Sequence, residues 1–159
     1  MKLAPTLLVS LLGACAFLSG CATPDKVSGI TVSLAGFRPA DAALRETRPI
    51  MTLRFTSEDV SAVAISGSSH KIYLNGKYAG KATVDTPLGL TALGTAIQEV
   101  PIDLENPALV KQAMAVPGQP LARYRVESVL HIADSEEKFQ IKTSFEGSIS
   151  LRGLEAAAR

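Results

Sequence analysis

Hydrophobic and polar residues alternate with a period of two along most of the chain after residue 28. Successive side chains of a β-strand point to opposite faces, so each alternating run predicts a strand with one core face and one solvent face. The apolar members of these runs are Ile30, Val32 and Leu34; Met51, Leu53 and Phe55; Val100, Ile102 and Leu104; Tyr124, Val126, Leu130 and Ile132; Phe139 and Ile141; and Ile149 and Leu151. Short half-buried strands favour an antiparallel sandwich over a parallel sheet.

Turn signals separate these runs, and the clearest is Asn75-Gly76, between residues 72–74 and 77–79. Both central residues of a type I′ turn need a positive φ, which Asn and Gly tolerate, so the segment predicts a β-hairpin. Further turns or bulges are expected at Gly36, Gly67, Gly94 and Gly147.

One segment has helical spacing instead. Asn106 is a candidate N-cap and Pro107 fits the first helical position, while Pro117-Gly118 ends the pattern. Apolar residues between them recur on one helical face. The sequence therefore predicts a short helix from about Pro107 to Val116 that packs on the sandwich. Residues 154–159 are compatible with one more helical turn.

The first residues have the pattern of a targeting signal. Lys2 precedes an apolar run from Leu3 to Leu18, and no acidic residue occurs before Asp25. The run is shorter than the roughly 20 residues of a transmembrane helix. We therefore interpret residues 1–20 as a secretory signal and exclude them from the fold.

Leu18-Ser19-Gly20-Cys21 resembles the lipobox of bacterial lipoproteins. The resemblance implies a diacylglycerol thioether on Cys21, cleavage before it, and a further acyl chain on the new amine. Two or three acyl chains anchor a protein far better than one. Ala22, in place of Asp, implies passage to the outer membrane. We therefore expect a lipid-anchored protein of the bacterial envelope, on the outer membrane and facing the periplasm.

Two alternatives to this anchor remain open. In the first, the chain is an ordinary secreted protein in which Cys21 is incidental. In the second, Leu12-Gly13-Ala14-Cys15 is the processed box, although that box truncates the apolar run. With cleavage before Cys21, the mature chain has no free thiol and no disulfide. We expect residues 21–28 to be a lipidated tether, residues 29–152 a single domain, and residues 153–159 a tail.

Several segments match a known family in order. They are Val32–Gly36, Met51–Phe55, Ile72–Gly80, Ala92–Gly94, Glu99–Ile102, the Pro107 helix, and Phe145–Leu151. Together they resemble the late embryogenesis abundant (LEA) type 2 group, also called the water stress and hypersensitive response (WHy) domain, whose bacterial members are often small lipoproteins. The resemblance implies an all-β fold, a fibronectin type III or immunoglobulin-like antiparallel β-sandwich with one short α-helix. It also implies tolerance of desiccation or other stress by binding or shielding partners, with no catalytic residues.

The chain departs from this family in one loop. Thr56-Ser57-Glu58-Asp59 stands where the family usually carries Asn-Pro-Asn. Asp and Ser make similar side-chain-to-backbone turn bonds, so we expect the fold to be kept. Any function tied to that loop is left open.

Composition weighs against nucleic-acid binding and catalysis. Lys and Arg number 16 against 15 Asp and Glu, which gives a net charge of +1 and no basic footprint for nucleic acid. Two His and two Cys leave few groups for metal or nucleophile chemistry. We therefore expect no enzyme, no cofactor and no metal site.

Two histidines, His70 and His131, are the candidate catalytic bases. Gly67-Ser68-Ser69-His70 places hydroxyls beside an imidazole, but no G-x-S-x-G elbow is present, so we interpret the segment as a turn before the strand at Ile72. His131, near Asp134, is interpreted as part of a solvated strand face. An enzyme built on either histidine is the third hypothesis, after the two that follow.

Residues 88–94 form an apolar, glycine-rich stretch that is either a buried edge or an exposed loop. If it is exposed, Leu88, Leu90 and Leu93 are the candidate contacts for an unknown protein or lipid partner. Arg123 and Arg125 share a strand face with Glu127 and are expected to pair across strands, with an anionic lipid or polymer as the alternative. The leading hypothesis is a non-enzymatic, membrane-anchored protective module; the runner-up is an accessory lipoprotein that carries an apolar ligand or docks on an envelope complex.

Overall fold

The computed structural model describes residues 29–38, 40, 42–114, 121–133 and 138–150. The predicted signal, the tether with Cys21, residues 115–120, and the tail lie outside the described residues. The domain boundaries at these ends therefore remain predictions.

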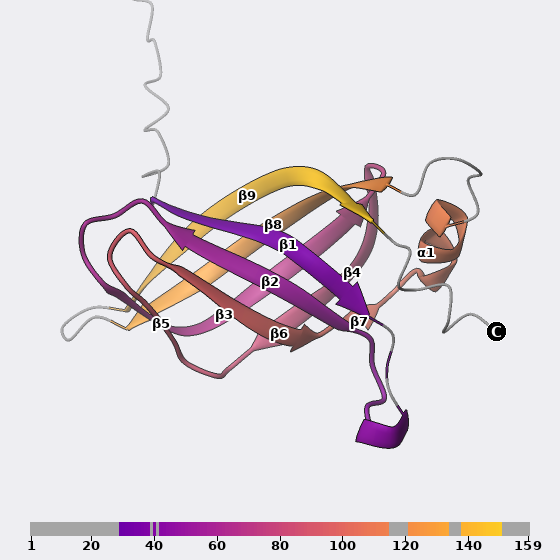
Figure 1. Ribbon diagram of the computed structural model, residues 1–159, viewed down its shortest axis with the longest axis horizontal. Helices are drawn as coiled ribbons and strands as arrows, with labels where there is room; N and C mark the ends of the chain where they lie inside the picture. Colours follow the sequence, from indigo (N-terminus) through magenta and orange to yellow (C-terminus); the bar gives the residue numbers. More distant parts are fainter. Residues whose placement is uncertain (1–28, 39, 41, 115–120, 134–137, 151–159) are drawn as a thin grey trace, which may run out of the picture.

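Two antiparallel sheets form the domain (Figure 1). The smaller sheet has the order β1-β2-β6, with β1 at Ile30–Arg38, β2 at Ile50–Ser57 and β6 at Thr95–Pro101. The larger sheet has the order β7-β4-β3-β8-β9. Its strands are β3 (Val63–Leu74), β4 (Lys77–Val84), β7 (Asp103–Leu104), β8 (Leu121–Ala133) and β9 (Lys138–Ser150), and β5 (Leu88–Leu90) pairs with β3. The predicted antiparallel all-β sandwich is confirmed.

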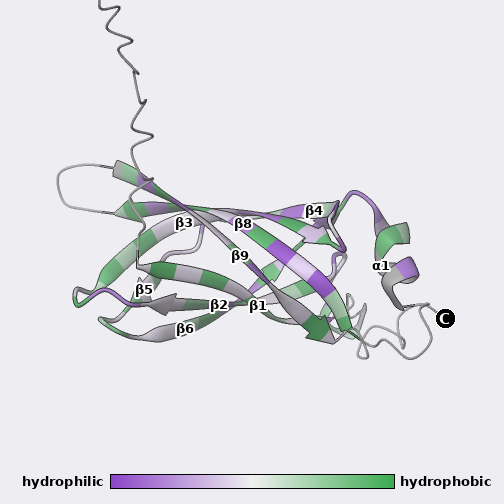
Figure 2. Cartoon of the chain, turned by 90° about the horizontal axis from the view of Figure 1, so that it is seen from above, coloured by the Kyte–Doolittle hydropathy of each residue, from purple (hydrophilic) through white to green (hydrophobic). Residues whose placement is uncertain are grey.

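The core lies between the sheets, where the inward-facing apolar residues of both layers meet. Figure 2 shows the two layers edge-on, with hydrophobic and hydrophilic residues alternating along the strands. Val32, Leu53 and Val126, all predicted to face inward, are at most 1% exposed. Burial of these side chains, each contributing about 1.5–3 kcal/mol, stabilises a domain whose described residues contain no cysteine.

The helix begins where the sequence predicts it. Helix α1 spans Pro107–Met114, and it lies at one end of the sandwich beside β4 (Figure 1). The amide of Leu109 donates to the carbonyl of Asn106 at 3.1 Å, which closes its first turn. A short 3-10 turn, η1 (Ala42–Leu44), connects β1 to β2.

The predicted hairpin is also confirmed. Asn75 and Gly76 have φ values of 48° and 78°, as a type I′ turn requires. The Asn75 side chain adds a role of its own, since its Oδ1 accepts a hydrogen bond from the Arg123 amide at 3.1 Å. The turn therefore also joins β3 and β4 to the start of β8.

Three of the four glycines expected at turns or bulges are correctly assigned. Gly36 and Gly67 stand at register shifts, and the Gly94 amide closes a turn on the Thr91 carbonyl at 3.0 Å. The expectation for Gly147 is wrong, because this residue lies inside β9 opposite Tyr124 without a register shift. A side chain there would lie 2.8 Å from the Tyr124 ring, so close packing explains the glycine.

The prediction that the run with Val100, Ile102 and Leu104 forms one strand is wrong. β6 ends at Pro101 in the smaller sheet, and β7 begins at Asp103 in the larger one. Between them, the Ile102 amide donates to the Pro49 carbonyl at 2.9 Å, and its side chain is fully buried. The chain thus crosses between sheets at this point while keeping its alternation.

The loop that departs from the family pattern makes the expected turn bonds. The Asp59 amide donates to Ser57 Oγ at 3.1 Å, and the Ser61 amide donates to Asp59 Oδ1 at 3.4 Å. The Glu58 amide also donates to the Gly29 carbonyl at 2.6 Å. The Ser and Asp side chains therefore shape the loop, and the Glu58 backbone bond joins it to the residue before β1.

Candidate functional site

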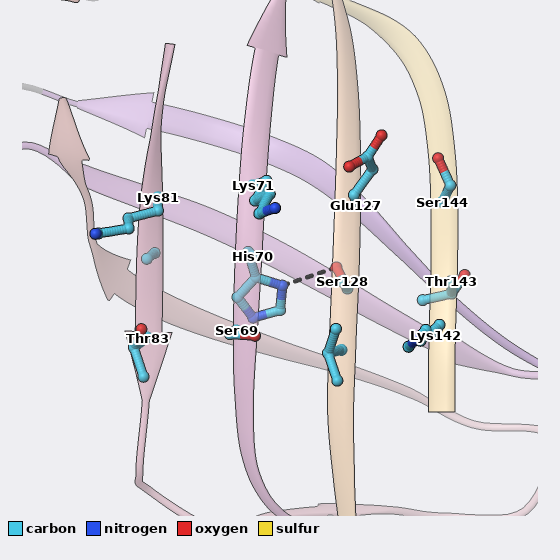
Figure 3. A pocket seen from close by; sticks show the side chains of 12 residues that line it. Ser69, His70, Lys71, Lys81, Thr83, Glu127, Ser128, Lys142, Thr143 and Ser144 are labelled. Carbon is cyan, nitrogen blue, oxygen red and sulfur yellow. Dashed lines mark hydrogen bonds between the residues drawn. The ribbon is translucent and has the colours of Figure 1, made fainter. Parts of the chain in front are cut away.

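A shallow hollow of about 610 Å³ lies on the outer face of the larger sheet. Figure 3 shows it across four neighbouring strands, β4, β3, β8 and β9, which each contribute side chains. Its lining includes Lys71, Lys81 and Lys142, together with the hydroxyls of Ser69, Thr83 and Ser144. The hollow therefore carries three ammonium groups, with hydroxyls and apolar surface between them.

Strand register arranges this lining in two adjacent rows. The first row reads Lys81, Lys71, Glu127, Ser144 across the four strands, and the second reads Thr83, Ser69, Val129, Lys142. Directly opposed residues have Cβ atoms about 4.5–5.5 Å apart, and like charges in that position are destabilising. The opposition of Lys71 and Lys81 is thus unfavourable in the absence of a counter-charge.

Glu127 is the carboxylate in this hollow, and its oxygens are engaged elsewhere. The Tyr73 hydroxyl donates to one oxygen at 3.2 Å, and Arg125 Nη2 lies 3.4 Å from the other. The Arg125 guanidinium in turn lies over the Tyr73 ring, 4.3 Å from its centroid, a cation–π contact. Arg125 therefore pairs with a residue of its own strand and stacks on a residue of the next one.

The lysines have few partners of their own. Lys81 Nζ lies 3.9 Å from Glu105, with both side chains more than half exposed. Lys71 and Lys142 form no ion pair with any other described residue. The hollow thus holds positive charge that the described carboxylates leave uncompensated.

Beneath the hollow, His70 points into the core. Its Nδ1 lies 2.8 Å from Ser128 Oγ and its Nε2 lies 2.9 Å from Ser68 Oγ, while the Phe55 ring meets it edge-to-face. Burial lowers the pKa of His70 from 6.5 to about 4, so the imidazole is neutral at physiological pH. A neutral imidazole donates through one nitrogen and accepts through the other, so both hydroxyls are satisfied.

The prediction that residues 67–70 form a turn is wrong, because they lie within β3. His70 is 1% exposed, so a substrate has no access to it. The other histidine, His131, lies on the exposed face of β8, with Nδ1 3.5 Å from Gln140 Nε2. Its expected neighbour Asp134 is outside the described residues.

The three leucines proposed as partner contacts do not share one surface. Leu90 is 2% exposed in the core, and Leu88 is half-buried beside it in β5. Leu93 is 69% exposed and has a φ of 52°. Its amide donates to the Asp59 carbonyl at 2.8 Å. Of the three leucines, Leu93 is therefore the one whose side chain is accessible to a partner.

No helix in the described part of the chain is long and apolar enough to cross a membrane. No group of three or more His, Cys, Asp or Glu side chains within the same residues is arranged to hold a metal ion.

Sequence reasoning missed the lysine hollow. A β-bulge between Ile72 and Tyr73 shifts the β3–β4 register by one residue and places Lys81 opposite Lys71. A hairpin continued without that bulge sets Gly80 there instead, so the turn motif alone did not indicate the pairing. The buried histidine did leave a signal in the sequence. Ser128, its hydrogen-bond partner, interrupts the alternating apolar positions of β8.

Comparisons with known proteins place the fold. No protein-family model matches the chain, and no curated protein matches it. The chain is similar to the solution structure of AT1g01470 from Arabidopsis thaliana, with a TM-score of 0.51 and 20% identity over 79% of this chain and 86% of that one. This similarity shows that the two proteins share the β-sandwich fold.

Two further solved structures are less similar to this chain. One is to a solution structure described as a late embryogenesis abundant protein, At2g46140.1, with a TM-score of 0.43 and 12% identity over 76% of this chain and 70% of that one. The other is to a crystal structure of a protein from Archaeoglobus fulgidus, with a TM-score of 0.40 and 13% identity over 76% of this chain and 94% of that one.

Proposed function

We propose that this chain is a non-enzymatic lipoprotein of the bacterial envelope, anchored by acyl chains on Cys21. Its sandwich would bind or shield partners under desiccation or other water stress. The observation that carries the stress role is the ordered set of motifs that resembles the LEA type 2 group, and the similarity to AT1g01470, which spans 79% of this chain, supports the fold. The Leu18–Cys21 motif supplies the anchor, and Ala22 favours the outer membrane facing the periplasm.

The chemistry of the described residues supports a non-catalytic role. A hydrolase needs a nucleophile, a base and an orienting acid that converge on an accessible point. His70 is enclosed by Phe55, Ser68 and Ser128, and the described residues set no carboxylate against it. These contacts suit an internal hydrogen-bonding role.

The anchor is tested by intact mass analysis of the protein purified from bacterial membranes. We expect a mature chain that starts at Cys21 and carries fatty acyl groups. A Cys21→Ser variant is expected to remain unprocessed, whereas Cys15→Ser, the matched control, is expected to be processed like the natural chain. An unacylated mature chain, or one whose first residue is not Cys21, contradicts the anchor.

The stress role is tested in cells. A strain lacking the gene is expected to survive drying and salt shock less well than its parent, and the natural gene is expected to restore survival. Complementation with the Cys21→Ser variant separates the need for the anchor from the need for the domain. Equal survival of the deletion strain and its parent contradicts the stress role and leaves the fold unaffected.

A second candidate is an accessory lipoprotein that docks on an envelope complex. Leu93, 69% exposed on the loop before β6, favours this reading, because an exposed apolar side chain suits a protein contact. Crosslinking in intact cells with the natural chain and a Leu93→Ser variant tests docking, and equal crosslinking contradicts a role for this residue.

A further inference from the structure

We propose that the hollow on the outer face of the larger sheet is a binding site for a phosphate-bearing ligand. Its determinants are Lys71, Lys81 and Lys142, with hydroxyls from Ser69, Thr83 and Ser144 beside them. This inference goes beyond the proposed function and does not depend on acylation of Cys21.

Charge is the first argument. Lys71 and Lys81 are directly opposed across β3 and β4, and the exposed Glu105, 3.9 Å from Lys81, is the carboxylate paired with them among the described residues. An anion between the two ammonium groups would offset their mutual repulsion. Lys142 belongs to the neighbouring row on β9 and adds a third positive charge on the far side of the hollow.

The state of Glu127 is the second argument. Register places this residue opposite Lys71, where it is the expected counter-charge. Its oxygens instead contact the Tyr73 hydroxyl and Arg125 Nη2, and Lys71 forms no ion pair within the described residues. The Tyr73–Arg125–Glu127 cluster thus holds the carboxylate away from the lysine and leaves the lysine free for a ligand.

The size and lining of the hollow indicate the class of ligand. Lysine ammonium groups bind phosphate as point charges, and hydroxyls donate to its remaining oxygens. A volume of about 610 Å³ exceeds that of an inorganic anion and is within the range of small-molecule sites. A phosphate ester fits this space, and its source is either a soluble metabolite-sized ester or a phospholipid headgroup.

The test is an NMR titration of the full chain in non-ionic detergent micelles. One arm adds glycerol phosphate, and the other adds phosphatidylglycerol to the micelles, with phosphatidylcholine as the lipid of zero net charge. We expect saturable shifts of the amides of Ser69, Lys71 and Lys142 that weaken as salt is raised. Shifts with glycerol phosphate alone identify a soluble ester, and shifts with phosphatidylglycerol micelles alone identify a headgroup.

Matched variants distinguish binding in the hollow from attraction to the overall charge of the protein. The Lys71→Gln/Lys142→Gln double variant is expected to weaken binding by about tenfold or more, because each lysine contact to the anion is charge-assisted. Lys77→Gln/Arg54→Gln removes the same charge outside the hollow and is expected to bind like the natural chain. The proposal is overturned by absence of saturable shifts with both probes, by shifts confined to residues outside the hollow, or by equal binding of the two double variants.

Discussion

The Nδ1 atom of His70 lies 2.8 Å from the hydroxyl oxygen of Ser128, in the core between the two sheets. Because this site favours the neutral imidazole, burial lowers the pKa of His70 to about 4. The unfolded chain, with its histidine near pH 6.5, therefore binds more protons between these two values. The His70 contribution to stability is complete above pH 6.5 and is lost as the pH falls toward 4.

This linkage predicts acid sensitivity that belongs to one histidine. The free energy of unfolding should fall by on the order of 3 kcal/mol between pH 6.5 and 4 through this group. Urea unfolding across this range measures it. A His70→Gln variant should be less stable at neutral pH and should lose this part of the slope, while His131→Gln, which changes an exposed histidine, should keep it. Identical slopes in the two variants contradict the assignment.

Close approach of two strands predicts the effect of a substitution at Gly80. A side chain there would lie 3.0 Å from the Leu104 Cα and closer still to the Asp103 carbonyl oxygen, so β7 must move away. Gly80→Ala should lower the free energy of unfolding by about 1–3 kcal/mol. Gly89→Ala is the matched control, because nothing lies within 4 Å of its added carbon, and it should be neutral or stabilise by up to about 1 kcal/mol. Thermal unfolding compares the two.

The two environments in the 88–94 stretch predict opposite outcomes for two leucines. Leu90→Ala removes a core side chain and should cost about 2–5 kcal/mol. Leu93→Ala changes an exposed one and should alter stability by less than about 0.5 kcal/mol. Chemical denaturation of both variants checks this. A large loss in Leu93→Ala would show that this side chain packs on the domain.

The hydrogen bond between the sheets predicts a role for one tyrosine hydroxyl. The Leu34 amide donates to the Tyr124 oxygen at 3.2 Å in a buried position, next to the register shift in β1. Tyr124→Phe should cost about 1–3 kcal/mol, because it leaves this amide without its partner. Tyr73→Phe, which removes a hydroxyl from a partly buried pair on the sheet surface, should cost less. Equal losses would contradict the assignment.

Much of the fold could be read from local rules. Alternation placed Val32, Leu53 and Val126 on the inner faces because the core accepts apolar side chains from every second residue. Asn75-Gly76 predicted its hairpin because the turn needs positive φ at both positions. Asn106-Pro107 predicted the start of α1 through the chemistry of the first helical turn.

The first half of β3 escaped these rules. Ser68 and His70 occupy inward positions there, and they are compatible with the core because the His70 ring hydrogen-bonds to Ser68 on one side and to Ser128 of β8 on the other. A group of three polar side chains that satisfy one another across two strands has no local sequence signature. The one sign of it in the sequence was Ser128, a polar residue among the alternating apolar positions of β8. This sign becomes informative only when the pairing of β3 with β8 is known.

The lysine hollow could not be predicted for a different reason. Lys71 and Lys81 face each other because of a bulge, and Lys142 joins them through the pairing of two other strands. Register over such distances depends on the whole sheet rather than on neighbouring residues. The separate charges were visible in the sequence, but their convergence was not.

The first strand of the sandwich packs against the last one, since β1 lies beside β9 along one side of the molecule (Figure 1). A chain that emerges from the ribosome N-terminus first therefore cannot complete this domain until its C-terminal strand has been synthesised. Until then the polypeptide lacks the contact between β1 and β9.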